Sequence, residues 1–304
     1  METRLKKTSI IIQSLVITGL FISQLTCLAQ SKSKIKIGSC AITWGNDYFA
    51  AIHESADLGY AGIQLRGNVY KAHQNNPDSL IKVLKQANIS MPIMSGSGLG
   101  SGKKSIEEEI EQLRLEATFV KKIGGEFLQV VGPKRDPENP PSDSLLIAFA
   151  KLMNQAGEIV AKEGIRLVFH NHMHDYGQKP EEIDVIAVNI DAKKVGLLLD
   201  VAHCYQGGGN PTEVFKKWQN NISIFHLKDV RPSSKKPEPY DYIFTELGEG
   251  KVELLPFFDA LKKSGFSGWA MVELDGVPEP GRTPKECAEI SKKFLEERVG
   301  LKMK

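Results

Sequence analysis

The chain has 304 residues, of which 41% are hydrophobic and 25% charged, and it contains only 4 cysteines. This is an ordinary globular composition, and it excludes a disordered chain, a collagen-like repeat and a disulfide-stapled miniprotein. The formal net charge is +2. Residues 1–29 hold 3 of the 39 basic and 1 of the 37 acidic side chains, so the rest of the chain carries 36 of each and is neutral. A neutral body gives no electrostatic footprint for nucleic acid or for an anionic membrane.

The first thirty residues have the pattern of a secretory signal peptide. A short positive segment precedes a mostly apolar run over residues 10–25, and Cys27 and Ala29 are small residues at positions −3 and −1 of a cleavage after Ala29. The run is short and interrupted by two glutamines, which disfavours a membrane-spanning helix. A lipid anchor at Cys27 is also disfavoured, because Thr26 stands where a very small residue is expected. We therefore expect a cleaved signal peptide at residues 1–29 and a secreted or periplasmic domain at residues 30–304.

Three cysteines follow this segment, Cys40, Cys204 and Cys287. No two of them have the C-x-x-C spacing of a metal site, and their odd number leaves at least one unpaired. We expect all three to be buried and to pack as small hydrophobic residues.

From residue 35 onward, short apolar runs alternate with amphipathic helical stretches. Several runs are apolar without alternation, which is typical of strands buried on both faces of a parallel sheet. Eight strand–helix units in a chain of this length predict a single-domain (β/α)8 TIM barrel. The predicted strands are Ile35–Trp44, Gly62–Leu65, Ile89–Ser95, Phe127–Gly132, Arg166–His172, Val195–Val201, Ile222–Asp229 and Trp269–Leu274. The predicted helices are Asp47–Leu58, Asp78–Ala87, Ser105–Ile123, Ser142–Lys162, Pro180–Asn189, Pro211–Asn220, Leu254–Ser264 and Thr283–Val299.

A doubly wound sheet is the alternative architecture. It is disfavoured because the turn after the first predicted strand, Trp44-Gly-Asn-Asp, is not a phosphate-binding glycine fingerprint. The stretch Arg231–Glu249 is rich in proline and serine near its start. We expect a long loop there, after the seventh strand and at the mouth where barrels carry their chemistry.

The four last predicted strands all end in ionisable side chains. These are His170 and His172, Asp200 and His203, His226 and Lys228, and Glu273 and Asp275. Singly, such a residue is most often a structural hydrogen-bonding group or a helix cap. Together, buried charges at one barrel mouth lose solvation unless something pairs them, and a divalent cation does so. Mixed imidazole and carboxylate ligands suit Mn, Co, Zn, Fe or Mg.

Four segments resemble those of the xylose isomerase-like TIM barrels, a family that includes sugar isomerases, epimerases, inosose dehydratase and 3-keto-glycoside lyases. The segments are Phe169-His-Asn-His, Leu199-Asp-Val-Ala-His, Phe225-His-Leu-Lys-Asp, and Gly248-Glu-Gly with Val272-Glu-Leu-Asp. The resemblance spans residues 30–304 in segment order, and the Asp200-x-x-His203 and His226-x-Lys228-Asp229 spacings are its most specific parts.

The resemblance implies that Asp200, His226 and Glu273 are metal ligands. Epimerases of the family carry a glutamate as fourth ligand at the end of strand five, where this chain has His170. Either His170 takes that place or the site has three protein ligands. Strand two departs as well, with Gln64 where many relatives carry glutamate.

A cation bound to the oxygen of a keto-sugar acts as a Lewis acid while a neighbouring base removes the α-proton. We expect Glu273 to be both ligand and proton acceptor, with His172 as the second candidate for the base. Lys228 would neutralise the developing oxyanion, with a salt bridge to a site carboxylate as its alternative role. Trp44, at the end of strand one, would stack on a sugar ring or pack at the barrel rim. His203 is the remaining expected substrate contact.

The sequence therefore predicts a metal-dependent sugar isomerase or epimerase, or a lyase or dehydratase, that acts through an enediolate. Secretion and the lack of a phosphate-binding motif favour an unphosphorylated sugar or keto-glycoside. A nuclease similar to endonuclease IV is a weaker alternative, because strands two and three end in Gln64-Leu-Arg and Met94-Ser-Gly without histidine, and the body is neutral. A non-catalytic sugar-binding barrel is the other alternative, and it would not need four converging ionisable strand ends. The oligomeric state stays open.

Overall fold

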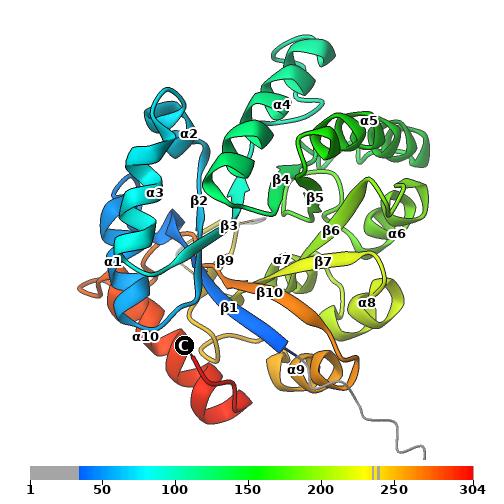
Figure 1. The fold of residues 1–304 in the computed structure, drawn as a ribbon. Coiled ribbons are helices and arrows are strands. Elements are labelled where there is room, and N and C mark those ends of the chain that lie inside the picture. Colours follow the sequence, from blue (N-terminus) through cyan, green and yellow to red (C-terminus); the bar gives the residue numbers. More distant parts are fainter. Residues whose placement is uncertain (1–33, 235, 238–239, 304) are drawn as a thin grey trace, which may run out of the picture. The chain divides into compact units, whose positions relative to one another are not determined.

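The computed structural model of the protein describes residues 34–234, 236–237 and 240–303, and the expected signal peptide at residues 1–29 lies outside them. Eight parallel strands form a closed barrel in the order β1-β10-β7-β6-β5-β4-β3-β2, and helices surround it (Figure 1). The predicted (β/α)8 barrel is confirmed. None of the helices in these described ranges has the length and apolar character needed to cross a membrane.

The barrel strands are β1 (Lys34–Cys40), β2 (Gly62–Leu65), β3 (Ser90–Ser95), β4 (Phe127–Val131), β5 (Arg166–His170), β6 (Val195–Asp200), β7 (Ile222–Leu227) and β10 (Ser267–Val272). The α-helices are α1 (Tyr48–Asp57), α2 (Gly67–His73), α3 (Pro77–Gln86), α4 (Ile106–Ile123), α5 (Asp143–Lys162), α6 (Pro180–Asn189), α7 (Val201–Gln206), α8 (Pro211–Trp218), α9 (Leu254–Lys263) and α10 (Pro284–Phe294). A 3-10 turn at Ala41–Trp44 follows β1, and a π-helical turn at Leu295–Val299 extends α10.

Two differences from the predicted strand ends bear on the site, and two helices were not predicted. Strand β1 ends at Cys40, so Trp44 lies in the 3-10 turn and not at a strand end. Strand β5 ends at His170, which puts His172 in the following loop. The short helices α2 and α7 were not predicted, because seven and six residues hold too little of a helical repeat to be recognised.

Side chains that face into the barrel form an apolar layer below a polar one. Along β10, alternation sends Trp269 and Met271 into the lumen below Glu273. The apolar layer is one buried cluster of Cys40, Ile93, Val168, Leu198, Ile224, Trp269 and Met271. Trp269 and Met271 need space on β2 and β1: a Cβ at Gly62 would lie 2.6 Å from the Trp269 ring, and one at Gly38 would overlap the Met271 side chain. Glycine on β1 and β2 therefore makes room for this layer.

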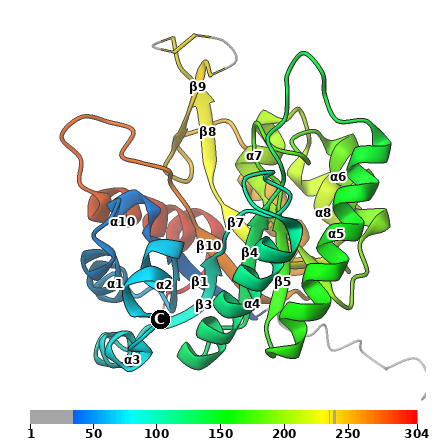
Figure 2. The same cartoon turned by 90° about the horizontal axis from the view of Figure 1, so that it is seen from above.

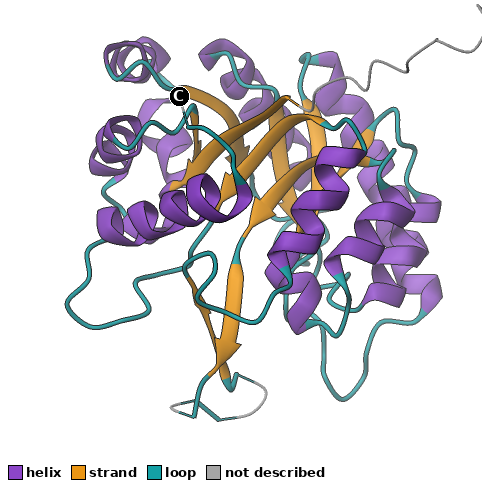
Figure 3. Ribbon diagram, turned by 90° about the horizontal axis from the view of Figure 1, so that it is seen from below, coloured by secondary structure: helices purple, strands orange, loops and turns teal. Residues whose placement is uncertain are grey.

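A long loop was expected over Arg231–Glu249, and that expectation is wrong where two short strands form. Residues Asp229–Pro232 (β8) and Tyr242–Thr245 (β9) pair as an antiparallel hairpin. The hairpin projects from the C-terminal side of the barrel (Figures 2 and 3). Its strands are only four residues each and are separated by a proline-containing segment, so they are too short to show a periodic pattern in the sequence.

Asp229 anchors the base of this hairpin. Its carboxylate is 1% exposed and accepts four backbone N–H bonds of 2.9–3.0 Å, from Val230 and Val252 on Oδ1 and from Gly248 and Gly250 on Oδ2. The approach at Gly250 is so close that a Cβ there would lie 2.1 Å from Asp229 Oδ1. Asp229 is thus a structural residue that joins the hairpin to the loop before α9.

We expect Asp229→Ala to lower the free energy of unfolding by about 3 kcal/mol or more, because several buried N–H groups lose their acceptor and each costs roughly 1–3 kcal/mol. Asp229→Asn keeps one acceptor oxygen and should lose less. Urea denaturation followed by circular dichroism measures both variants. A loss below about 0.5 kcal/mol in Asp229→Ala, the size of an ordinary surface substitution, would contradict the anchoring role.

Candidate metal centre and active site

Four ionisable side chains from adjacent strands converge below the barrel mouth, and we call them the ligand cluster. They are His170 and Asp200 at the ends of β5 and β6, His226 on β7, and Glu273 directly after β10. One potential ligand atom from each lies within 4.8 Å of the others. All four are buried. The structure therefore brings together all the residues that the sequence predicted as metal ligands.

Asp200 is positioned by contacts to both its backbone and its carboxylate. The side chain of Asn171 accepts the Asp200 N–H at 2.8 Å and donates to the Asp200 carbonyl at 3.1 Å. Asp200 Oδ1 caps α7 by accepting the N–H groups of Ala202 and His203 at 2.9 and 2.8 Å. Its Oδ2 makes no hydrogen bond and lies 3.7 Å from His226 Nδ1. One oxygen is thus structural, and the other is left for the ligand cluster.

His226 and Glu273 face each other, with 3.0 Å between His226 Nδ1 and Glu273 Oε2. Burial opposes the charged form of His226, but neighbouring groups, Glu273 foremost, outweigh it and place the pKa of His226 well above 6.5. Burial likewise favours the neutral form of Glu273. For Glu273, the nearby charges of His226 and Lys228 outweigh the effect of burial and hold its pKa well below 4.5. Both residues are therefore charged at neutral pH when nothing else occupies the cluster.

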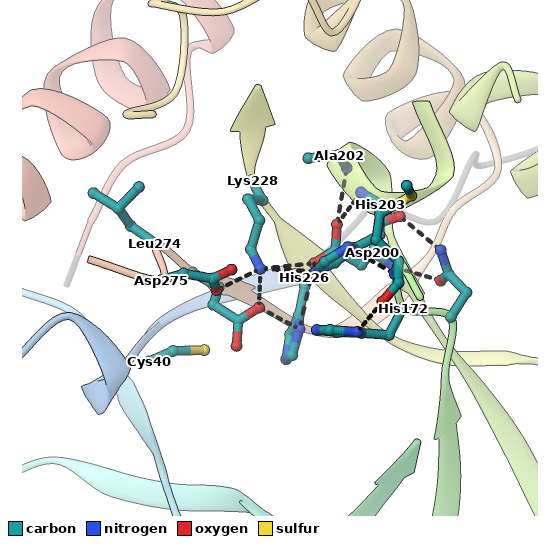
Figure 4. Close-up of polar contacts among 12 residues, drawn as sticks. Cys40, His172, Asp200, Ala202, His203, His226, Lys228, Leu274 and Asp275 are labelled. Carbon is teal, nitrogen blue, oxygen red and sulfur yellow. Dashed lines mark hydrogen bonds and ion pairs between the residues drawn. The ribbon is translucent and has the colours of Figure 1, made fainter. Parts of the chain in front are cut away.

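Lys228 lies just beyond β7 and is 1% exposed. Its Nζ is 2.7 Å from Glu273 Oε2, 2.9 Å from Asp275 Oδ1 and 3.5 Å from Asp200 Oδ2 (Figure 4). Burial alone would lower the pKa of Lys228, but these three carboxylates raise it well above 10.5. The salt-bridge role considered from the sequence is thus present, and it holds a permanent positive charge beside the cluster.

His203 contacts the cluster without belonging to it. Its Nδ1 accepts the Met173 N–H at 3.1 Å, and its Nε2 is 3.2 Å from Lys228 Nζ. Burial and Lys228 hold the pKa of His203 well below 6.5, so the ring is neutral. With one nitrogen engaged and an ammonium group at the other, His203 is poorly placed to bind a cation, although it lies near His170 and His172. His203 is 1% exposed and is not among the residues that line the cavity over the cluster, so the expected substrate contact stays a prediction.

His172 lies in the loop after β5, with its ring centroid 5.4 Å from that of His170. Two acceptors converge on its Nδ1, the Met173 carbonyl at 2.7 Å and Asp175 Oδ2 at 3.0 Å. Such contacts put the hydrogen on Nδ1 and leave Nε2 with a free lone pair. Asp175 is 1% exposed and was not predicted from the sequence, where it is one of several polar residues in a loop.

The side chains of the cluster fit a divalent cation. The atoms His170 Nδ1, Asp200 Oδ2 and His226 Nδ1 are buried and have no hydrogen-bond partner. Asp200 Oδ2 and His226 Nδ1 are in ion-pair contact with Lys228 and Glu273, whereas a buried atom without any partner, as His170 Nδ1 is, costs roughly 1–3 kcal/mol. Burial lowers the pKa of His170 well below 6.5, so its imidazole is neutral and able to bind a metal. Two imidazoles and two carboxylates form a donor set suited to Zn, Mn, Co or Fe.

A polar cavity opens over the cluster. Its lining includes Cys40, Gln64, Arg66, Ser95, Gln129, His170, His172, Glu273 and Asp275. Cys40 is a free thiol, as are Cys204 and Cys287, and all three are buried as expected. Burial raises the pKa of Cys40 to about 11, which keeps it protonated.

Trp44 does not line this cavity. Its indole N–H donates to Glu54 Oε2 at 2.7 Å and its ring packs against the core. Trp44 therefore packs at the barrel rim, which was its alternative role. It does not lie where it could stack on a sugar in this cavity. The sequence pointed to Trp44 because strand one was drawn four residues too long.

Residues 52–298 match the family described as xylose isomerase-like TIM barrel, and the chain belongs to this family. Inosose dehydratase from Clostridium botulinum (strain Alaska E43 / Type E3) is 28% identical over 305 residues, which cover 89% of this chain and 99% of that protein. Inosose dehydratase from Geobacillus kaustophilus (strain HTA426) is 26% identical, with 90% and 97% covered.

Solved structures of low sequence identity share the fold. The probable 3-DHS dehydratase AsbF from Bacillus anthracis gives a TM-score of 0.71 at 15% identity, with 86% of this chain and 99% of that chain covered. An IOLI protein with a bound zinc atom gives 0.71 at 22% identity, with 87% and 98% covered. The family resemblance drawn from the strand ends is confirmed.

Asp200→Asn tests the metal assignment sharply, because Asn keeps the Oδ1 acceptor that caps α7 and replaces only the Oδ2 oxygen. We expect this variant to fold with an unchanged circular dichroism spectrum and to lose stoichiometric divalent metal, measured by mass spectrometry after dialysis. Asp191→Asn removes a carboxylate outside the cluster and is the matched control. Full metal content in Asp200→Asn would refute the assignment.

Proposed function

We propose that the protein is a metal-dependent dehydratase or lyase that removes the α-proton of a keto-sugar and expels a β-substituent. The observation that carries the proposal is the buried ligand cluster, with its three unbonded atoms beside the lone pair of His172. Family membership, relatives named inosose dehydratase and the zinc atom in the IOLI structure support it. These observations all support a broader conclusion, that the protein is an enzyme acting on sugars.

A divalent cation held by His170, Asp200, His226 and Glu273 would polarise the substrate carbonyl as a Lewis acid. His172 is the better proton acceptor of the two expected bases. Glu273 Oε2 is already in contact with Lys228 and His226, whereas His172 Nε2 keeps its lone pair. Lys228 Nζ is engaged by Glu273 and Asp275, and its positive charge would stabilise the negative charge that develops on the substrate oxygen.

Elimination fits these groups better than epimerisation. Epimerisation by two bases needs a proton acceptor on each face of the carbon, and strand β5 ends in His170 where the epimerases of the resemblance carry a carboxylate. For elimination a single base suffices. His172 takes the α-proton, the electron pair forms the carbon–carbon double bond, and the protonated imidazole can return its proton to the departing oxygen.

The substrate we propose is an unphosphorylated keto-sugar, inosose or keto-glycoside. Arg66 is the only cationic residue in the described lining of the cavity, so there is no clamp of several basic groups for a phosphate. The expected signal peptide at residues 1–29 supports the same choice, because it would place the protein outside the compartment of sugar phosphates.

The test is to incubate metal-loaded protein with inosose and with 3-keto-glucosides in heavy water and to follow products by NMR. We expect an unsaturated product with release of water or of the aglycone. Deuterium exchange without release would instead indicate an epimerase or isomerase. No exchange with any keto-sugar would remove the proposed mechanism.

His172→Ala should lose about 10²–10⁴-fold in rate, the usual contribution of general acid–base catalysis, while keeping its metal. His174→Ala is the matched control, since His174 lies in the same loop but contacts Tyr242 of the hairpin at 3.1 Å and does not line the cavity. We expect its rate to stay near that of the wild type. Equal rates in the wild type and His172→Ala would show that His172 is not the base.

A further inference from the structure

Three polar side chains on β2, β3 and β4 form a hydrogen-bonded row beside the ligand cluster. Gln64 Nε2 donates to Gln129 Oε1 at 2.6 Å and to Ser95 Oγ at 3.0 Å. Gln64 is 2% exposed and Gln129 is 8% exposed. They occupy the same inward-facing layer as the cluster but on the opposite half of the barrel. Nothing in the proposed reaction uses them.

The row orients Gln64 toward a cluster residue. Both hydrogens of its amide are donated to Gln129 and Ser95, so its Oε1 is the atom that points toward β7. There it lies 2.8 Å from His226 Nε2 and accepts from that ring, and the thiol of Cys40 also approaches it at 3.6 Å. With Gln129 Oε1 facing Gln64, the reverse orientation of the Gln64 amide would bring two oxygens together, which is repulsive.

We propose that Gln64 is a positioning residue that fixes the hydrogen of His226 on Nε2 and so makes Nδ1 the ligand atom. An imidazole can present either nitrogen, and the hydrogen bond at one nitrogen decides which one is free for a metal. Here Nδ1 is the atom within 3.0 Å of Glu273 and 3.7 Å of Asp200. This inference rests on the metal centre of the proposed function and assigns it a partner that carries no charge.

Gln129 has a supporting part in the same row. Its Oε1 accepts one hydrogen of the Gln64 amide, and this contact keeps Gln64 from turning over. Because Gln64 and Gln129 are neutral, the row orients His226 without adding negative charge to the ligand. A carboxylate at position 64 would also accept from Nε2, but it would make the imidazole a more basic ligand.

The experiment compares metal affinity in the full chain for Gln64→Leu, Gln64→Glu and Gln129→Leu, using zinc and cobalt alone with a chelator as competitor. We expect Gln64→Leu to bind zinc about 10–100-fold more weakly, the usual effect of losing such a partner. Gln129→Leu should lose less, and Gln64→Glu should bind at least as tightly as the wild type. The Co²⁺ absorption spectrum should change in Gln64→Leu and return toward the wild-type form in Gln64→Glu.

Nitrogen NMR of the zinc-loaded wild type gives a second readout that needs no variant to fold. We expect His226 to carry its hydrogen on Nε2, and a hydrogen on Nδ1 would overturn the inference. Unchanged zinc affinity in Gln64→Leu, with a wild type that binds zinc, would also overturn the role of Gln64 while leaving the metal centre intact. A wild type that binds no divalent metal would overturn the metal centre itself, and the role of Gln64 with it.

Discussion

Closure of the barrel brings polar side chains of β2 to β7, and of the residue that follows β10, together below the mouth, and the proposed chemistry depends on that constraint. The layer beneath is apolar and fully packed, with Trp269 and Met271 filling the lumen. The buried polar groups above the apolar layer therefore stay close to one another and away from bulk water. They have to be satisfied by their neighbours in the layer or by a bound ion.

The two halves of the polar layer meet this requirement differently. On the side of β2 to β4, the neutral groups of Gln64, Ser95 and Gln129 satisfy one another. On the side of β5 to β10, hydrogen bonding is less complete, because buried nitrogen and oxygen atoms of His170, Asp200 and His226 have no hydrogen-bond partner. The half at β2 to β4 orients the side chain of His226, and the half at β5 to β10 is suited to bind a metal ion.

Lys228 sets the electrostatic character of the binding half. Its ammonium contacts Glu273 and Asp200 from the hairpin side, where Phe244 of β9 covers it with the ring centroid 4.5 Å away. A buried charge of this kind persists only with close partners, since an unpaired one costs several kcal/mol. The hairpin, anchored through Asp229, thus matters for the site because its Phe244 ring shields the Lys228 ammonium from water.

The barrel and the ligand cluster could be predicted from the sequence, because apolar strands and the ionisable residues that end them leave local signals. His170, Asp200, His226 and Glu273 each follow directly on an apolar run, so their meeting follows from the fold alone. The contacts that orient them could not be predicted in this way. Gln64, Gln129 and Asp175 act through hydrogen bonds to residues on other strands and loops, and only the three-dimensional register decides which atoms meet. Trp44 shows the converse case: the sequence predicted it at a strand end, but strand β1 ends four residues earlier and Trp44 lies outside the cavity lining.

Phasing-quality diffraction at a metal absorption edge tests the account most directly. Crystals of the purified protein grown with Zn²⁺ or Mn²⁺ should show one anomalous peak in the ligand cluster, with ligand distances of about 2.0–2.2 Å for zinc. His226 should bind through Nδ1, with its Nε2 still on Gln64. A cluster that holds no anomalous peak at saturating metal, with Lys228 alone between Asp200 and Glu273, would contradict the account.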